Sequence, residues 1–235
     1  MIVEELAQYL GKNYQPGKLT WTMEHAAALV RGWDDFGAFQ QREKEVLYLL
    51  AQVERDEWWW PHGAFLREVL SVYHRGGSSL SILEYPAGIG SFGLALAEMG
   101  YEVAFADYQG KPAEFLRWRL KRRKVNWPVY DAEKDEIHHR DVAVSFWTAQ
   151  RYPPEQQWKF INDLAEYAGL IVMDLDGRWA SLPCFHAVDG PALVEQIVQK
   201  YEVLVHKVVN QFVHLVVFKT GIVGIPDAGS KLEET

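Results

Sequence analysis

Apolar residues in the first 75 positions recur at the three- and four-residue spacing of amphipathic helices, and no clear strand pattern interrupts them. A Trp-rich linker, residues 57–62, divides this region. Three consecutive tryptophans cannot all enter one core from a helix, so either one of them faces a cleft or partner, or together they fasten the region to the rest of the chain. The pattern predicts helices over residues 23–30, 39–53 and 63–73.

From about residue 78 the pattern changes to short apolar runs of strand length that alternate with helical stretches. Two β-rich runs end the series, residues 202–210 and 212–219, and almost nothing separates them. Such close spacing permits only an antiparallel pair. We therefore predict five β-α units followed by a hairpin. The expected strands end near 84, 107, 131, 146 and 174, and the expected helices are 91–98, one from 111, one from 153 that ends at Gly169, and one from 189.

The stretch from Leu80 to Gln109 reads as a strand, a glycine-rich turn, a helix and a second strand. This order is half of a nucleotide-binding fold. Its glycines, at 88, 90 and 93, have the G-x-G-x-x-G spacing that on its own favours NAD. Glu84 argues against NAD, because a carboxylate at the first strand end repels a pyrophosphate and attracts an ammonium or sulfonium group.

Residues 84–90, Glu-Tyr-Pro-Ala-Gly-Ile-Gly, resemble the E/D-x-G-x-G-x-G signature of class I S-adenosylmethionine (SAM) dependent methyltransferases, with Pro86 in place of the first glycine. The order of elements extends the resemblance over about residues 78–220. It implies a Rossmann-like α/β fold whose seven-stranded sheet is mostly parallel and ends in an antiparallel hairpin. Residues 1–77 would form an N-terminal helical cap, and residues 221–235 a solvated tail.

In such sheets ligands bind at the carboxyl ends of the strands. The resemblance implies that Glu84 serves the methionyl ammonium, that the glycines let the chain pass close to the ligand, and that Asp107 accepts the ribose hydroxyls. Tyr108 or Gln109 would flank the adenine. Asp131 either contacts the adenine amino group or is a turn aspartate. The expected SAM-binding residues are Glu84, Pro86, Gly88, Gly90, Asp107, Tyr108, Gln109, Asp131, Ala132, Phe146 and Trp147.

Members of this family often carry a Glu-His pair after the fourth strand, where this chain has Gln150 and Arg151. No catalytic residue can therefore be carried over to those positions. A base is needed only for an oxygen or nitrogen acceptor of high pKa. The candidate bases are His62, His186 and Asp174, with Asp176 as a further alternative, and each lone histidine has a structural role as its alternative reading. No spacing of His, Cys and carboxylates indicates a metal site.

Charge and cysteine content narrow the picture further. The net charge is −8, yet residues 111–124 carry seven basic residues and one acid, which leaves about −14 on the rest by subtraction. This basic helix is either a track for an anionic substrate or RNA phosphates, or, as we favour, a solvated helix that neutralises neighbouring carboxylates. Cys184, the one cysteine, excludes an intrachain disulfide and is expected to be a buried thiol.

The chain lacks an apolar run of eighteen residues and an N-terminal secretory pattern, so we expect no membrane span and a cytoplasmic location. Together these features predict a SAM-dependent methyltransferase that acts by in-line displacement on a small or medium-sized acceptor chosen by the Trp-rich cap. Nucleic acid is the less favoured partner. The alternatives are a NAD(P)-binding oxidoreductase and an inactive SAM-fold binding protein.

Overall fold

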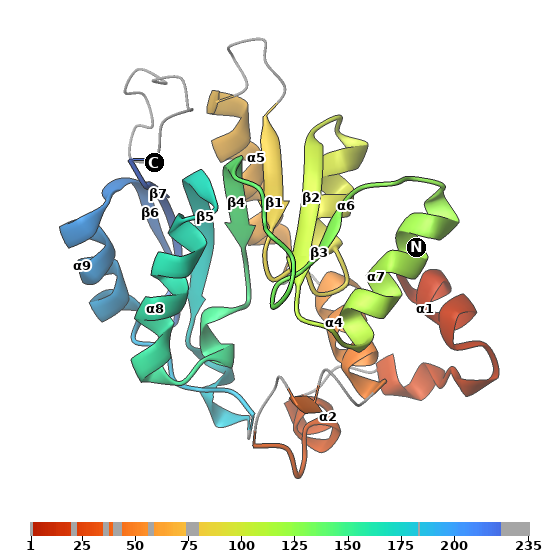
Figure 1. Cartoon of the computed structure of the whole chain (residues 1–235). Helices are drawn as coiled ribbons and strands as arrows, with labels where there is room; N and C mark the ends of the chain where they lie inside the picture. The colour runs from red at the N-terminus through yellow and green to blue at the C-terminus, as the bar shows by residue number, and fades with distance from the viewer. Residues whose placement is uncertain are drawn as a thin grey trace.

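A computed structural model describes residues 2–19, 23–34, 38–39, 44–55, 59–73, 80–182 and 184–221. Its centre is a seven-stranded sheet of order β3-β2-β1-β4-β5-β7-β6 (Figure 1). The first five strands run parallel, and β7 lies antiparallel between β5 and β6. This arrangement confirms the predicted mostly parallel sheet with its terminal hairpin. The strands are β1 (Ser81–Glu84), β2 (Glu102–Asp107), β3 (Val129–Asp131), β4 (Arg140–Ser145), β5 (Ala168–Asp176), β6 (Glu202–Asn210) and β7 (Val213–Lys219).

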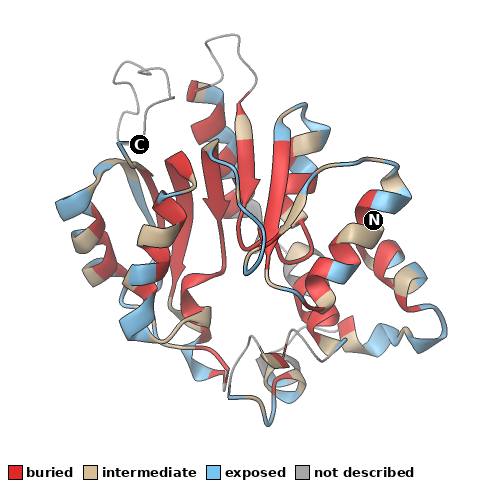
Figure 2. Ribbon diagram, viewed as in Figure 1, coloured by how far each residue is buried: buried red, intermediate tan, exposed pale blue. Residues whose placement is uncertain are grey.

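Both faces of the sheet are covered, which explains why its inner strands read as continuous apolar runs. Ile82 of β1 is in register with Val142 of β4 on one face, and the next pair, Leu83 and Ala143, lies on the other. Figure 2 shows the central strands buried along most of their length. The first face packs against α5 (Trp59–Tyr73) and α6 (Ser91–Glu98), and the second against α8 (Pro154–Ala165) and α9 (Gly190–Lys200).

The remaining N-terminal helices form a separate hydrophobic cluster beyond the carboxyl ends of the strands, below the sheet and to its right in Figure 1. Phe115 joins this cluster from α7 (Lys111–Arg123), and Trp147 and Trp179 join it from the loops that follow β4 and β5. Its members come from α1 (Ile2–Leu10), α2 (Met23–Leu29) and α4 (Glu45–Arg55). Short 3-10 helices are η1 (Gly11–Asn13), η2 (Pro16–Leu19), η4 (Ala149–Arg151) and η5 (Arg178–Ser181).

Some predictions were wrong. Residues 132–139, between β3 and β4, form no helix, so four β-α units precede the hairpin and not the predicted five. The helix α5 begins at Trp59, so His62 lies in its first turn and not in a linker; Pro61 is tolerated there because the first turn needs no N–H donor. Likewise α4 begins at Glu45 and not near 39. Gly169 does not end a helix but belongs to β5, whose backbone pairs with β4 and β7 on its two sides.

Other expectations fall outside the described residues. Trp58 is one of these, as are the side chains of Trp59 and Trp60 and the predicted tail from residue 222 onward. Among the helices that are described, none is both long enough and apolar enough to cross a membrane.

Candidate functional site

A pocket lies where the carboxyl ends of β1 and β4 meet, the point at which the strand order reverses. Open α/β sheets bind ligands at this point. The pocket holds about 400 Å³ of empty space, part of it open to solvent. Five predicted SAM-binding residues line it. The full lining is Leu50, Glu84, Pro86, Ala87, Gly88, Ile89, Ser91, Phe92, Phe146, Trp147 and Arg151.

The carboxylate of Glu84 sits at the N-terminus of α6. Its two oxygens accept hydrogen bonds from the N–H groups of Phe92, at 3.2 Å, and Gly93, at 2.8 Å. Burial raises the pKa of Glu84 to about 8, although both hydrogen bonds act in the opposite direction. A Cβ at Gly93 would lie 2.7 Å from a Glu84 oxygen and 2.4 Å from the Phe105 ring. The third glycine is therefore required for this close approach.

Two other glycines shape the loop that leads into α6. Gly88 has a φ of 56° and Gly90 a φ of 77°, both in the left-handed region that favours glycine. The Gly90 N–H donates to the Ala87 carbonyl at 2.8 Å, which closes a tight turn. A Cβ at Gly90 would also meet the Leu116 side chain at 2.4 Å. We call residues 86–91 the glycine loop.

Asp107 attaches the glycine loop to the end of β2. Its carboxylate accepts hydrogen bonds from the Gly88 N–H, at 2.6 Å, and from the Tyr108 N–H, at 2.7 Å. Burial raises the pKa of Asp107, and the charge of Arg151 opposes that shift. Each carboxylate oxygen still has a second lone pair, so the predicted ribose contact is compatible with these bonds.

The predicted adenine residues group beside Asp107, apart from the pocket lining. The Ala132 N–H donates to the Asp107 carbonyl at 2.9 Å, which joins the ends of β2 and β3. Asp131 forms a turn, because its carboxylate accepts from the Glu133 N–H at 3.1 Å and from Lys134 at 2.9 Å. The hydrogen bond from Lys134 lowers the pKa of Asp131.

Next to this group, the Tyr108 hydroxyl lies 3.3 Å from the hydroxyls of both Tyr85 and Tyr152. Gln109 belongs to the same region, where Arg117 donates to its side chain at 3.4 Å.

Two of the candidate bases meet in the structure although 112 positions separate them. His62 Nε2 lies 3.0 Å from Asp174 Oδ2, and both side chains are buried. The His62 ring stands edge-on to Phe146 in the pocket lining, with centroids 5.0 Å apart. The other oxygen of Asp174 accepts from the Trp147 N–H at 2.7 Å. This bond holds Trp147 at a φ of 58°, a conformation that large side chains rarely adopt and that often marks a functional site.

The other two candidates have different surroundings. His186 lies in the loop before α9, where its backbone N–H donates to the Gln150 carbonyl at 2.8 Å. The Asp176 carboxylate accepts from Arg178 at 2.6 Å and from the Trp179 indole at 3.0 Å, so it fixes the turn after β5. Cys184 is buried in the N-terminal cluster. In the described part of the chain, no three His, Cys, Asp or Glu residues are grouped to hold a metal ion.

Six lining residues lie outside the predicted set. Four of them belong to the glycine loop or the start of α6, and the other two, Arg151 and Leu50, come from elsewhere in the chain. Arg151 stacks its guanidinium 5.2 Å from the centre of the Trp147 ring, and burial lowers its pKa while Asp107 and Asp174 oppose that shift. Its position after the fourth strand is a signal of a site residue, but in the sequence it marks only a departure from the family's Glu-His pair. Leu50 reaches the pocket from α4 and lies against Gly88. The helical spacing of the apolar residues predicts that Leu50 is buried, but it does not predict which part of the chain Leu50 contacts.

Neither a protein-family model nor a curated protein sequence matches this chain. Solved structures do. The magnesium protoporphyrin IX methyltransferase ChlM of Synechocystis PCC 6803, with bound SAM, is 14% identical over 82% of this chain and 96% of its own, with a TM-score of 0.55. The PH0226 protein of Pyrococcus horikoshii OT3 is 15% identical over 71% and 92%, with a TM-score of 0.57.

A third similar structure is the glycopeptide N-methyltransferase MtfA, 15% identical over 66% of this chain and 89% of its own, with a TM-score of 0.50. At such low sequence identity, these structural similarities show a shared fold and nothing about activity or substrate. Together with the strand order, they show that the chain has the fold of the class I SAM-dependent methyltransferases.

Proposed function

We propose that this chain binds SAM at the β1–β4 strand ends and transfers its methyl group to a small or medium-sized acceptor. The observation that carries the proposal is the charge pattern of the pocket. Its two ionisable lining residues are one acid, Glu84, which a bound ammonium would keep in its ionised form, and one base, Arg151. A methionyl group ends in an ammonium and a carboxylate, so opposite charges on the protein would complement both.

The surrounding residues suit the rest of the ligand. Asp107 would accept the ribose hydroxyls with its carboxylate, and the Tyr108 group offers aromatic surface beside it. SAM, when bound, supplies an electrophilic methyl group on a sulfonium. Phe146 and Trp147 in the lining would attract that cation with their ring faces. Leu50 and these two aromatic residues favour an acceptor with apolar or aromatic parts.

The pair formed by His62 and Asp174 supplies a base for an acceptor that must lose a proton. His62, oriented by its contact with Asp174, would take the acceptor proton. Asp174 would then stabilise the imidazolium that forms. A neutral amine or a thiolate would not need this step.

Isothermal titration with SAM, S-adenosylhomocysteine, NAD and NADP tests the cofactor. We expect the two sulfur compounds to bind and the dinucleotides not to bind. Binding of NAD alone would replace the proposal with an oxidoreductase. The Arg151→Gln variant should bind S-adenosylhomocysteine about tenfold or more weakly, since hydrogen bonds to charged groups contribute about 1.5–3 kcal/mol. It should bind methylthioadenosine, which lacks the amino-acid part, as the wild type does.

Methyl transfer is tested separately, with methyl-labelled SAM and a panel of small aromatic hydroxyl, amine and thiol compounds. Label in one of these products would support the enzyme. Binding of SAM without transfer to any acceptor class would favour the inactive SAM-fold protein instead.

A further inference from the structure

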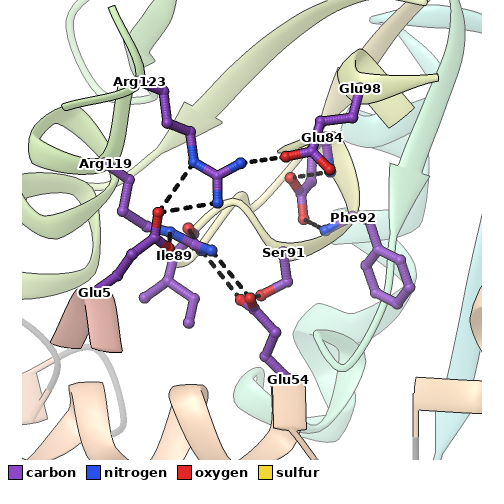
Figure 3. A network of polar contacts seen from close by, with 10 residues as sticks. Glu5, Glu54, Glu84, Ile89, Ser91, Phe92, Glu98, Arg119 and Arg123 are labelled. Carbon is purple, nitrogen blue, oxygen red and sulfur yellow. Dashed lines mark hydrogen bonds and ion pairs between the residues drawn. The ribbon is translucent and has the colours of Figure 1, made fainter. Parts of the chain in front are cut away.

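Arg119 of α7 is a buried arginine whose guanidinium joins three separate parts of the chain (Figure 3). Its Nε donates to Glu5 of α1 at 2.9 Å, and its Nη2 donates to Glu54 of α4 at 3.0 Å. Its Nη1 donates to the backbone carbonyl of Ile89, in the glycine loop, at 2.6 Å. One side chain therefore holds two N-terminal helices and the predicted cofactor loop together.

The bond to Ile89 fixes the orientation of one peptide unit in the loop. That unit carries the Ile89 carbonyl, which accepts from Arg119, and the Gly90 N–H, which donates to the Ala87 carbonyl at 2.8 Å. A rotation of this peptide plane would break both hydrogen bonds. Leu116, one turn before Arg119 on α7, packs against Gly90 in the same place. Thus α7 sets both the position and the orientation of the loop.

Glu54 holds the other side of the loop. Its Oε2 accepts from the Ser91 hydroxyl at 2.5 Å and from Arg119 at 3.1 Å (Figure 3). Leu50, one turn earlier on the same helix, lines the pocket. The helix α4 therefore lines the pocket through Leu50 and also fixes the glycine loop, which lines the same pocket.

We infer that Arg119 is a positioning residue for the cofactor: it holds the glycine loop in its binding conformation and makes α1 and α4 part of the cofactor site. This inference rests on the proposed function, SAM binding at that loop. Arg119 acts on the ligand through Ile89 directly and through Glu54 on Ser91. The N-terminal helices would then be needed to bind the cofactor, in addition to any part in choosing the acceptor.

Arg123 offers a matched control. It lies one turn further along α7 and donates to the same Glu5, at 3.1 Å. Its other bond is to Glu98, at the end of α6 away from the glycine loop. Removing its charge disturbs the same ion network without touching the loop.

The test measures S-adenosylhomocysteine affinity by titration calorimetry, and thermal stability, for wild type, Arg119→Lys, Glu54→Gln and Arg123→Gln. Lysine keeps the charge but loses the fork that reaches three acceptors at once. We expect Arg119→Lys to weaken binding about tenfold or more, and Glu54→Gln about threefold or more. Arg123→Gln should lower the melting temperature yet keep the affinity within about twofold.

Equal affinity in all four proteins would overturn the inference while leaving the proposed function intact. Weaker binding in Arg123→Gln to the same degree would also overturn it, because general loosening would then explain the loss. If the wild type itself binds neither SAM nor S-adenosylhomocysteine, the proposed function fails and the inference falls with it. Should Arg119→Lys fail to fold, Glu54→Gln decides the question, since Glu54 lies outside the pocket lining.

Discussion

At the scale of single residues, Glu84 shows what burial does to a carboxylate that has no cation bonded to it among the described contacts. Its partners are two backbone N–H groups, and burial outweighs them, raising its pKa to about 8 from an ordinary 4.5. The folded protein therefore holds a proton on Glu84 that the unfolded chain has released. A bound ammonium beside Glu84 would reverse this by favouring the ionised form.

The pH dependence of stability follows from that shift. Between the unfolded and folded pKa values the folded state binds more protons at Glu84, so the contribution of this group to stability is fully present below about pH 4.5 and is lost as the pH rises towards about 8. The slope from this one group is about 1.4 kcal/mol per pH unit. We expect the stability of Glu84→Gln to fall less steeply than that of the wild type, by about this slope, because burial raises the pKa of Asp107 as well. Urea unfolding of both proteins from about pH 5 to about pH 8 measures it, and parallel curves would contradict the assignment.

The pair formed by His62 and Asp174 makes a second residue-scale prediction. If His62 takes the acceptor proton, His62→Gln should lower the rate of methyl transfer by about a hundredfold or more. Affinity for S-adenosylhomocysteine should stay near the wild-type value, because His62 is outside the pocket lining. Single-turnover transfer with labelled SAM gives the rate. An unchanged rate would leave the histidine a structural role on Phe146.

Residues at strand ends were the easiest to predict. Glu84, Phe146 and Trp147 follow apolar runs, and parallel strands bring their carboxyl ends to one edge. The contact between His62 and Asp174 was beyond the sequence, since it depends on how α5 packs across the sheet. A role for Arg151 could not be predicted from the sequence, because that role depends on the pocket that Arg151 shares with Glu84.

At the scale of elements, composition and spacing lead to different predictions for the basic helix α7. Its charge suggested a surface element, and Lys121, Arg122 and Lys124 are indeed exposed. Arg119 falls on the same stripe as Phe115 and Leu116, at the spacing of one helical face, and is buried with them. The helical spacing alone is therefore enough to predict that the Arg119 side chain is buried. Its carboxylate partners could not be named, because they belong to α1 and α4.

The N-terminal region also divides in a way that its pattern did not reveal. Helices α1, α2 and α4 gather beyond the strand ends, as a cap would, whereas α5 packs on the face of the sheet beside α6. An apolar stripe on a helix predicts that one face is buried, but it does not predict which element covers that face. The first strand begins at Ser81, and α5 is the last described helix before it.

At the scale of the whole molecule, the order of strands and helices along the sequence was sufficient to predict the fold. Alternating strand and helix patterns followed by a hairpin are compatible with few topologies, since connections between parallel strands are right-handed and rarely cross. The switch between β1 and β4 then fixes where a ligand binds. What the order could not show is that the N-terminal helices are fixed to that site by Arg119 and Glu54.

That attachment has a consequence for the whole chain. A ligand that binds only the folded protein stabilises it by about 2.7 kcal/mol at a hundredfold excess over its dissociation constant. Local openings gain protection only where they disturb the site. Because Glu54 of α4 bonds the loop at Ser91, and Arg119 bonds both Glu5 of α1 and the loop at Ile89, undocking of α1 or α4 would loosen the loop. S-adenosylhomocysteine should therefore slow amide exchange in α1 and α4 as much as in α6.

Hydrogen exchange with mass-spectrometric detection, with and without the ligand, measures this effect. The helix α9 is the internal control, since it packs on the opposite face of the sheet. Amides of α9 that exchange by local opening should keep their rates. In Arg119→Lys at saturating ligand, the protection of α1 and α4 should shrink while that of α6 persists, because the loop then binds without holding the helices. Protection limited to the loop and α6 in the wild type would show that the N-terminal helices dock independently of the site.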